Sequence, residues 1–169
     1  MRRLLCTIGF AGKTAEEFFV LLLDAGVEQV IDIRQNRSGQ LSGFAKHPDL
    51  SYFLRTIAAI SYRHEPLLAP PPELLKSYRS AKDWPAYETG FFEVMKKRAV
   101  PASLDTASWS SRVALLCSEP GPEKCHRRLV ADLLAVHCRE RGDTVEIRHL
   151  LSARTKLPKP RRKKRGIAS

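Results

Sequence analysis

The segment over residues 113–128 limits the choice of fold more than any other part of the chain, because an apolar strand pattern passes through a Pro/Gly turn into a helix pattern. The apolar run ends at Cys117. The helix that follows carries Cys125, His126 and Arg127 near its start. Open α/β sheets bind ligands where strand ends lead into helix starts. An arginine there adds to the positive end of the helix dipole, which favours a bound anion. The segment therefore predicts an α/β fold with an anion site at this junction.

Strand and helix patterns alternate along the rest of the chain. Thr14 and Glu17 form a capping box that starts the first helix, and Gly26 ends that helix. Short links between strand and helix patterns favour parallel strands. The sequence therefore predicts a three-layer, Rossmann-like α/β domain with a mainly parallel sheet. The expected strands are residues 4–8, 27–33, 61–64, 112–117 and 144–150, and the expected helices cover 14–25, 48–60, 73–79, 83–95 and 122–141.

The positive charge of the chain is concentrated at its C-terminal end. The whole chain has 29 basic and 18 acidic residues, but residues 151–169 contain eight of the basic residues and none of the acidic ones. We therefore divide the chain into a single α/β domain over residues 1–151 and a basic tail over residues 152–169, which we expect to be disordered. Such a tail predicts either salt-sensitive attachment to the phosphates of nucleic acid or a terminus that only adds solubility.

The sequence predicts a cytoplasmic protein that does not associate with membranes. No apolar stretch approaches the length of a membrane span, and the basic start of the chain lacks the long apolar region of a signal peptide. The cysteine spacing does not match a small disulfide scaffold, so we expect reduced thiols. The four cysteines are Cys6, Cys117, Cys125 and Cys138.

Polar residues at two predicted strand ends are expected to meet at one edge of the sheet. Asp32 and Arg34 are two residues apart at the end of the second strand, so their side chains point to the same face. Cys117 and Glu119 stand at the end of the fourth strand. Because parallel strands end at the same edge, the two sets are expected to form one pocket with the helix start.

A long polar stretch, residues 35–47, follows the second strand and is long enough to close over this pocket. It contains Arg37 and Phe44. Aromatic side chains stack on bases in nucleic-acid sites, and Phe44 is the better stacking candidate because it lies in a loop. Trp84 and Tyr87 have helical spacing, which favours core packing for both.

Four segments of the chain match a known family. They are Thr7-Ile8-Gly9 with the capped helix after it, Asp32-Ile33-Arg34 with its loop, Trp84-Pro85-Ala86-Tyr87, and Cys117-Ser118-Glu119 followed by Cys125-His126-Arg127. On these motifs the chain resembles the bacterial domain of unknown function 488 family over residues 4–150. The resemblance implies the family's fold and a site at the motifs, without an established reaction. The family commonly has a polar residue such as His where this chain has Phe10.

Residues near the predicted helix start have chemistry suited to catalysis. A cysteine at a helix start beside His126 and Arg127 is expected to have a lowered thiol pKa, so Cys125 is the candidate nucleophile or redox thiol. His126 titrates near neutral pH and is the candidate proton carrier, with Asp32 or Glu119 as its partner. Helical spacing by itself favours core packing for Cys125, in a stripe with three later helix residues: Leu129, Leu133 and Val136.

Three arginines are the candidate anion-binding residues: Arg34, Arg37 and Arg127. A guanidinium holds phosphate or carboxylate with two parallel hydrogen bonds. The alternative is neutralisation within the protein, in which Asp32 pairs with Arg34, and Glu119 or Glu123 pairs with Arg127. Only the functional interpretation requires a cavity beside these charges.

Metal binding has some support in the sequence. Cys117, Cys125 and His126 are residue types that zinc accepts. Neighbouring helix residues point about 100° apart, however, which argues against joint coordination by Cys125 and His126. The sequence therefore predicts neither a metal nor a cofactor, and a cysteine-centred redox or metal protein is kept as an alternative.

The leading hypothesis is a protein that binds or acts on a phosphate-bearing ligand, either nucleic acid or a nucleotide. The main alternative is a noncatalytic nucleic-acid-binding module. An enzyme requires a concave pocket at the strand ends, whereas a binding module requires only a shallow basic surface. The sequence leaves open whether the protein is an enzyme.

Overall fold

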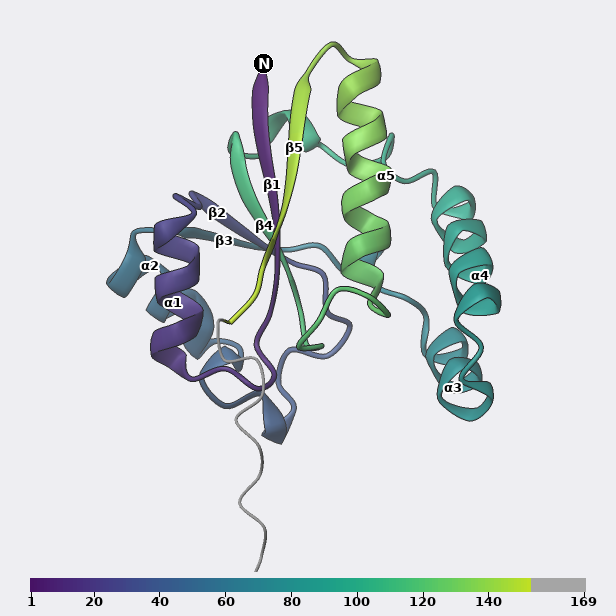
Figure 1. The fold of residues 1–169 in the computed structure, drawn as a ribbon, viewed down its shortest axis with the longest axis horizontal. Helices are drawn as coiled ribbons and strands as arrows, with labels where there is room; N and C mark the ends of the chain where they lie inside the picture. Colours follow the sequence, from purple (N-terminus) through teal and green to yellow (C-terminus); the bar gives the residue numbers. More distant parts are fainter. Residues whose placement is uncertain (153–169) are drawn as a thin grey trace, which may run out of the picture.

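The computed structural model describes residues 1–152 and contains a parallel sheet covered by helices on both faces (Figure 1). The strands are β1 (Arg2–Gly9), β2 (Gln29–Asp32), β3 (Ser61–His64), β4 (Arg112–Cys117) and β5 (Thr144–Leu150). The helices are α1 (Ala15–Asp24), α2 (Asp49–Ala58), α3 (Pro72–Ala81), α4 (Trp84–Lys97) and α5 (His126–Glu140). All strand pairs are parallel, in the order β3-β2-β4-β1-β5. The predicted three-layer α/β fold is confirmed.

The capping residues seen in the sequence set the helix starts. Thr14 Oγ1 accepts the backbone N–H of Glu17 at 3.1 Å, and Glu17 Oε2 accepts the N–H of Thr14 at 2.9 Å. Asp83 Oδ1 accepts the N–H of Ala86 at 3.0 Å at the start of α4. Each contact satisfies an N–H that the first helical turn leaves without a partner.

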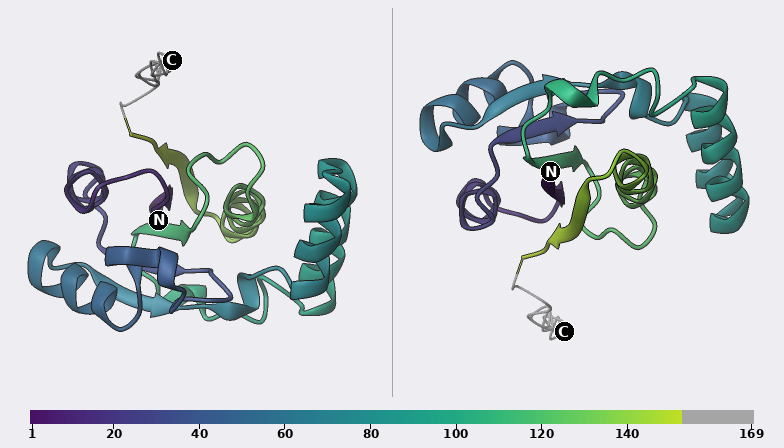
Figure 2. Two further views of the ribbon diagram at one scale, coloured as in Figure 1. Left: turned by 90° about the horizontal axis from the view of Figure 1, so that it is seen from below. Right: turned by 90° about the horizontal axis from the view of Figure 1, so that it is seen from above.

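Two apolar clusters hold the layers together, one on each face of the sheet. Helices α1 and α2 cover one face, and α5 covers the other with the α3–α4 pair beyond it (Figure 2). Strand β4 lies in the middle of the sheet, so its side chains contribute to both clusters: Val113 and Leu115 to one, and Ala114 and Leu116 to the other. Burial on both faces explains why this strand reads as one continuous apolar run.

Helix α5 begins at His126 rather than at Pro122. Cys125 is its N-cap residue and has an extended backbone, with φ −135° and ψ 136°. Because Cys125 precedes the helix, counting in helical steps from Cys125 does not identify the helix residues that face the core. The predicted stripe is therefore wrong at Val136, which is 52% exposed. The side chains that α5 does bury include Val130, Ala131, Leu134 and Cys138.

The long stretch over residues 35–47 contains a short 3₁₀ helix, Gln40–Ala45. Within residues 1–152, no helix is long and apolar enough to cross a membrane. Apart from its first residue, the predicted basic tail lies outside the described residues.

Candidate functional site

The carboxyl ends of β2 and β4 are direct neighbours in the sheet. Asp32 is in register with Leu116, and the N–H of Ile33 donates to the carbonyl of Leu116 at 3.1 Å. On the other side of β4, Gly9 at the end of β1 is in register with Cys117. The strand ends that the sequence was expected to bring together therefore lie side by side.

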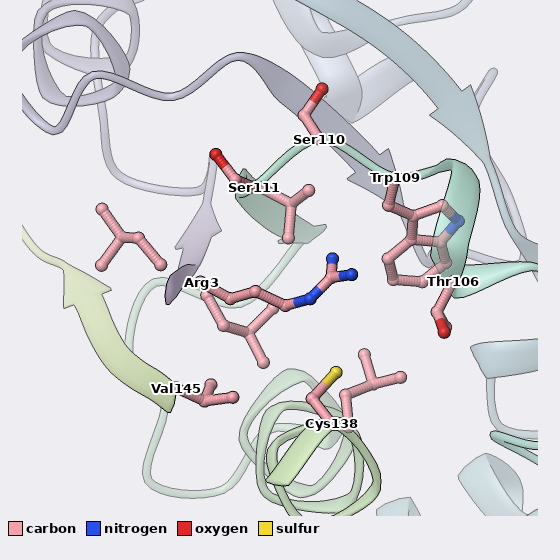
Figure 3. A pocket seen from close by; sticks show the side chains of 11 residues that line it. Arg3, Thr106, Trp109, Ser110, Ser111, Cys138 and Val145 are labelled. Atoms are coloured by element: carbon pink, nitrogen blue, oxygen red, sulfur yellow. The ribbon is translucent and has the colours of Figure 1, made fainter. Parts of the chain in front are cut away.

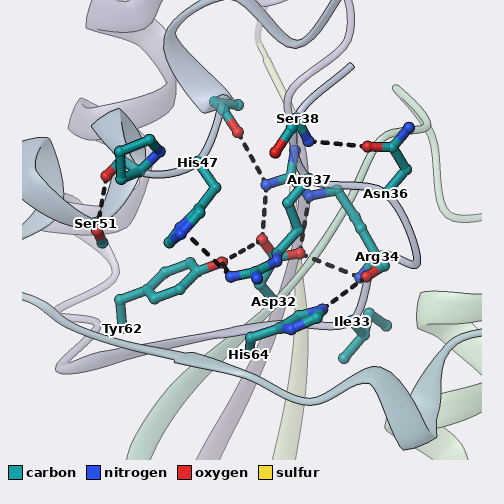
Figure 4. Close-up of polar contacts among 12 residues, drawn as sticks. Asp32, Ile33, Arg34, Asn36, Arg37, Ser38, His47, Ser51, Tyr62 and His64 are labelled. Carbon is teal, nitrogen blue, oxygen red and sulfur yellow. Dashed lines mark hydrogen bonds and ion pairs between the residues drawn. The ribbon is translucent and has the colours of Figure 1, made fainter.

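Asp32 and Arg34 form a buried ion pair at the end of β2 (Figure 4). Arg34 donates from Nε to Asp32 Oδ1 at 2.8 Å and from Nη2 to Oδ2 at 2.7 Å. Arg34 Nη2 also donates to the carbonyl of Ala45 at 2.9 Å, which ties the pair to the long loop. The Arg34 side chain is only 3% exposed, yet its Nη1 has no hydrogen-bond partner among the described residues.

Residues of β3 hold this ion pair in place. Tyr62 donates its hydroxyl to Asp32 Oδ2 at 2.7 Å, and His64 Nε2 donates to the carbonyl of Arg34 at 3.0 Å (Figure 4). Burial raises the pKa of Tyr62 to about 12, so its hydroxyl remains a donor at neutral pH. Phe10 covers the pair from the β1 side, with its ring centre 5.3 Å from the Arg34 guanidinium carbon.

Two thiols and an imidazole gather between the end of β4 and the start of α5. The Cys125 thiol donates to Cys117 Sγ at 3.1 Å, and His126 Nδ1 lies 3.8 Å from the same sulfur. The bond from Cys125, helped by His126, holds the pKa of Cys117 well below that of an ordinary thiol. The same bond and burial raise the pKa of Cys125. The arrangement therefore favours Cys117 over Cys125 as the nucleophilic thiol.

The imidazole of His126 is held from its other side by the main chain. Its Nε2 donates to the carbonyl of Ile33 at 3.2 Å. Burial has the largest single effect on the pKa of His126 and lowers it, but the charge of Cys117 and the hydrogen bonds to Cys117 and to the Ile33 carbonyl together outweigh burial, so the net shift is upward. The Cys117 thiol and the His126 imidazole therefore stabilise each other's charged forms.

Arg127 is completely buried and has partners within the protein. Its Nη1 donates to the carbonyl of Glu119, and its Nη2 donates to the carbonyl of Pro120 at 3.2 Å. The Glu119 carboxylate, expected as a neutralising partner, is on an exposed residue and forms no ion pair with Arg127 among the described contacts. These two carbonyls satisfy Nη1 and Nη2, whereas the buried Nε of Arg127 has no hydrogen-bond partner among the described residues.

Gly9 makes this close packing possible. A Cβ at position 9 would overlap the carbonyl oxygen of Glu119 and would lie 2.7 Å from Arg127 Nη1. The chain can therefore pass from β4 to α5 over the end of β1 only because residue 9 has no side chain.

Two adjoining cavities open at this edge of the sheet. The first has a volume of about 210 Å³ and lies beside the strand ends. The second, of about 790 Å³, lies beside the loops after β1 and β2 and shares Asn36, Arg79 and Ser118 with the first. We call the two together the strand-end groove. The first cavity is lined by Arg34, Gln35, Asn36, Pro70, Leu75, Arg79, Cys117, Ser118, Glu119 and His126. The second is lined by Phe10, Ala11, Gly12, Lys13, Asn36, Gly39, Gly43, Phe44, Arg79 and Ser118.

A third cavity lies at the opposite edge of the sheet, near Arg3 and Trp109 (Figure 3). Its volume is about 20 Å³, close to that of one water molecule. It is too small for a substrate. Two further cavities, of about 520 and 280 Å³, lie away from the carboxyl ends of β2 and β4. The strand-end groove is the candidate site because it is the one that the clustered polar residues line.

Comparison with protein families matches residues 14–134 to the domain of unknown function DUF488. The matched range contains the Asp32–Arg34 pair and the Cys117, Cys125 and His126 cluster. The chain belongs to the DUF488 family. The resemblance drawn from the sequence motifs is thereby confirmed. No curated protein and no solved structure gave a significant match.

The site residues that the sequence singled out fall into three groups in this DUF488 fold. The first group lines the groove: Arg34, Cys117, Glu119, His126 and Phe44. The second group is buried and contacts the first group or its backbone: Asp32, Cys125 and Arg127. Arg37 forms the third group, because it points to Tyr62 and His47 and lines neither cavity (Figure 4).

Phe44 has a packing role besides lining the groove. Its ring centre lies 5.2 Å from that of Phe18 and 6.3 Å from that of Phe19. Phe44 lies in the 3₁₀ helix Gln40–Ala45 rather than in an irregular loop, and α1 already covers part of its ring.

Sequence reasoning missed two cations of the DUF488 groove. Lys13 follows β1, whose end lies at the same sheet edge, and this position was a usable signal. Arg79 has no comparable signal, because it reaches the groove only through the way α3 packs near the strand ends. Sequence reasoning also missed Tyr62 and His64, whose contacts with Asp32 and Arg34 depend on the β2–β3 pairing.

Proposed function

We propose that this DUF488 protein binds a phosphate-bearing ligand of the nucleotide class in the strand-end groove. The observation that carries the proposal is Arg34, a buried guanidinium that lines the groove and has one nitrogen without a hydrogen-bond partner. An unsatisfied buried donor costs free energy, and a phosphate oxygen is the acceptor that a guanidinium recognises best.

The charges of the groove support an anionic ligand. Arg34, Arg79 and Lys13 line it, and Glu119 is the one carboxylate-bearing residue among the lining residues. Burial, together with the charge of Arg127, lowers the pKa of Lys13. The negative charge of a bound phosphate would oppose the effects of burial and of Arg127, and would stabilise the charged form of Lys13.

The shape and lining of the groove support a nucleotide rather than free phosphate alone. Ligand pockets usually have volumes of about 300–1,000 Å³, and the larger cavity, of about 790 Å³, lies in that range. Phe10 and Phe44 line it and offer apolar surface to a base, while Arg34 lines the smaller cavity and Arg79 borders both.

Groups able to exchange protons border the phosphate end. His126 and Glu119 line the smaller cavity, whereas Asp32 and Cys125 lie behind its wall. If the protein is an enzyme, His126 is the proton carrier that can reach a ligand, and Asp32 acts by holding Arg34.

The test is the affinity of the full chain for nucleoside monophosphates, measured by calorimetry. Arg79 is exposed, so Arg79→Gln removes a groove charge without disturbing the core. We expect the affinity to fall about tenfold, the loss of roughly 1.4 kcal/mol. The matched control is Lys76→Gln, on the same helix and outside both cavities. Absence of binding by the wild type, or equal affinity in the two variants, would contradict the proposal.

A nucleic-acid end is the second candidate ligand. Residues 151–169 carry eight basic residues and no acidic one, and contacts of this kind add affinity through backbone phosphates. A chain ending at residue 152 should then bind oligonucleotides more weakly and with a smaller salt dependence, while its affinity for nucleoside monophosphates stays the same. Equal salt dependence in the two chains would exclude the tail from binding.

A further inference from the structure

We propose that Cys117, Cys125 and His126 form a binding site for a thiophilic divalent cation, with zinc as the preferred ion. Their ligand atoms, two Sγ and one Nδ1, all lie within 4.8 Å of one another. In a tetrahedral zinc site, bond lengths of about 2.3 Å to sulfur and 2.0 Å to nitrogen place the ligand atoms roughly 3.5–3.8 Å apart. The Cys117–His126 distance is 3.8 Å, and the two sulfurs, 3.1 Å apart, need to separate by about 0.7 Å.

The objection that adjacent residues diverge on a helix does not apply here. Cys125 has an extended backbone and stands before the first helical residue, His126. The change of backbone conformation between the two residues turns both side chains toward Cys117. A cysteine followed directly by a histidine can therefore supply two ligands to one ion.

The surroundings of the three ligands are those of a metal site. His126 Nε2 donates to the carbonyl of Ile33, which directs Nδ1 at the sulfurs, where it can coordinate an ion once it has lost its proton. Histidine ligands of metals are typically fixed in this way, by a carbonyl or carboxylate on the other ring nitrogen. Arg127 adds a side-chain donor to Cys125 Sγ at 3.6 Å.

Main-chain donors also reach both sulfurs. The backbone N–H of Glu119 contacts Cys117, and the backbone N–H of Arg127 contacts Cys125. Donors of this kind stabilise negative charge on sulfur, which a metal ligand carries because only the deprotonated thiol binds the ion. Binding therefore releases to the solvent the protons held by the thiols and by His126 Nδ1.

The site has an open side. Cys117 and His126 line the 210 Å³ cavity, and Cys125 lies behind them. Three protein ligands with a fourth position open to a cavity are typical of catalytic rather than structural zinc sites. The fourth ligand is expected to be exchangeable: water, or an anion that occupies the groove. The metal site goes beyond nucleotide binding and does not depend on it.

The test uses the reduced full chain, stripped of metal with a chelator and titrated with Co²⁺ and then Zn²⁺. We expect one Co²⁺ per chain, with sulfur-to-cobalt charge-transfer absorption and the visible bands of tetrahedral coordination, both removed by Zn²⁺. Inorganic phosphate should change the visible bands if the fourth position opens into the groove. The absence of charge-transfer absorption would overturn the proposal. If phosphate does not change the visible bands, the claim that the fourth ligand position opens into the groove would be overturned.

Variants assign the ligands. Cys125→Ser and His126→Gln should weaken Co²⁺ binding by roughly a hundredfold or more, because even the loss of a residue behind a metal ligand costs about 10–100-fold. Cys138→Ser is the matched control, since Cys138 is a buried cysteine of the same helix outside the cluster. Equal Co²⁺ affinity in Cys125→Ser and Cys138→Ser would overturn the assignment. A Cys117–Cys125 disulfide formed in air by a chain that takes up no metal when reduced would also overturn it. None of the affinity measurements uses a nucleotide, so failure of this site and failure of nucleotide binding are separate results.

Discussion

Asp32 accepts two hydrogen bonds from the guanidinium of Arg34, at 2.8 and 2.7 Å, behind the wall of the strand-end groove. The pair leaves Arg34 Nη1 without a partner among the described residues, although the guanidinium is almost wholly enclosed. A charge in this position is fixed before any ligand arrives. The phosphate-binding proposal depends on this preorganised guanidinium.

Asp32→Asn should destabilise the fold by about 3–5 kcal/mol, because it leaves the buried Arg34 charge without its carboxylate. Urea denaturation measures the change. Asp24→Asn, at the exposed end of α1, is the control and should change stability by less than about 0.5 kcal/mol. A loss below 1 kcal/mol in Asp32→Asn would mean that the ion pair contributes little to the fold.

Tyr62→Phe should cost about 1.5–3 kcal/mol, the usual contribution of a hydrogen bond to a charged group. The hydroxyl it removes donates to Asp32 Oδ2 at 2.7 Å. Tyr52→Phe is the matched control, because Tyr52 is 54% exposed on α2. Equal stabilities of the two variants in urea would show that Tyr62 does not support Asp32.

Gly9→Ala should destabilise the fold by about 1–3 kcal/mol, since the added methyl group forces the chain after β4 and Arg127 to move. Gly90→Ala provides the comparison. A Cβ at position 90 meets only the end of the flexible Leu74 side chain, at 2.9 Å, and alanine favours the helix. Thermal unfolding should therefore separate the two alanine variants. Similar melting temperatures would contradict the close approach at Gly9.

Lys13 should make nucleotide affinity depend on pH. Burial, the nearby charge of Arg127 and the opposing charge of Glu17 leave its pKa below the 10.5 of an ordinary lysine. The charged form binds phosphate, so affinity should be full near neutral pH and should fall as the pH rises through the lowered pKa. Lys13→Gln should bind more weakly at neutral pH and lose this part of the pH dependence. Parallel affinity–pH profiles from calorimetry would exclude Lys13 from the site.

The elements that could be predicted from the sequence are those marked by patterns within a short stretch of chain. The limits of β3, β4 and β5 follow from short apolar or β-favouring runs between turns, and the α1 start follows from the Thr14 capping box. The position of Asp32 and Arg34 beside Cys117 follows from parallel pairing of two strand ends. These inferences need only side-chain periodicity and the rule that parallel strands end at one edge.

The remaining features depend on contacts between distant segments. The enclosure of Arg127 requires that the chain after β4 fold over Gly9, which no local pattern records. Arg79 enters the groove only through the packing of α3. The geometry of Cys125 and His126 was misjudged because the helix was expected to begin at Pro122, and a shift of four residues changes which side chains can converge.

The ¹H–¹⁵N spectrum of the full chain, recorded during titration with a nucleoside monophosphate, locates the ligand residue by residue. Phosphate binding in the groove predicts saturable shifts of the Arg34 Nε–H signal and of the Lys13 and Ser118 amides, with little change around Arg3 and Trp109 at the opposite edge of the sheet. Shifts confined to residues outside the strand-end groove, or a spectrum that does not change, would contradict it.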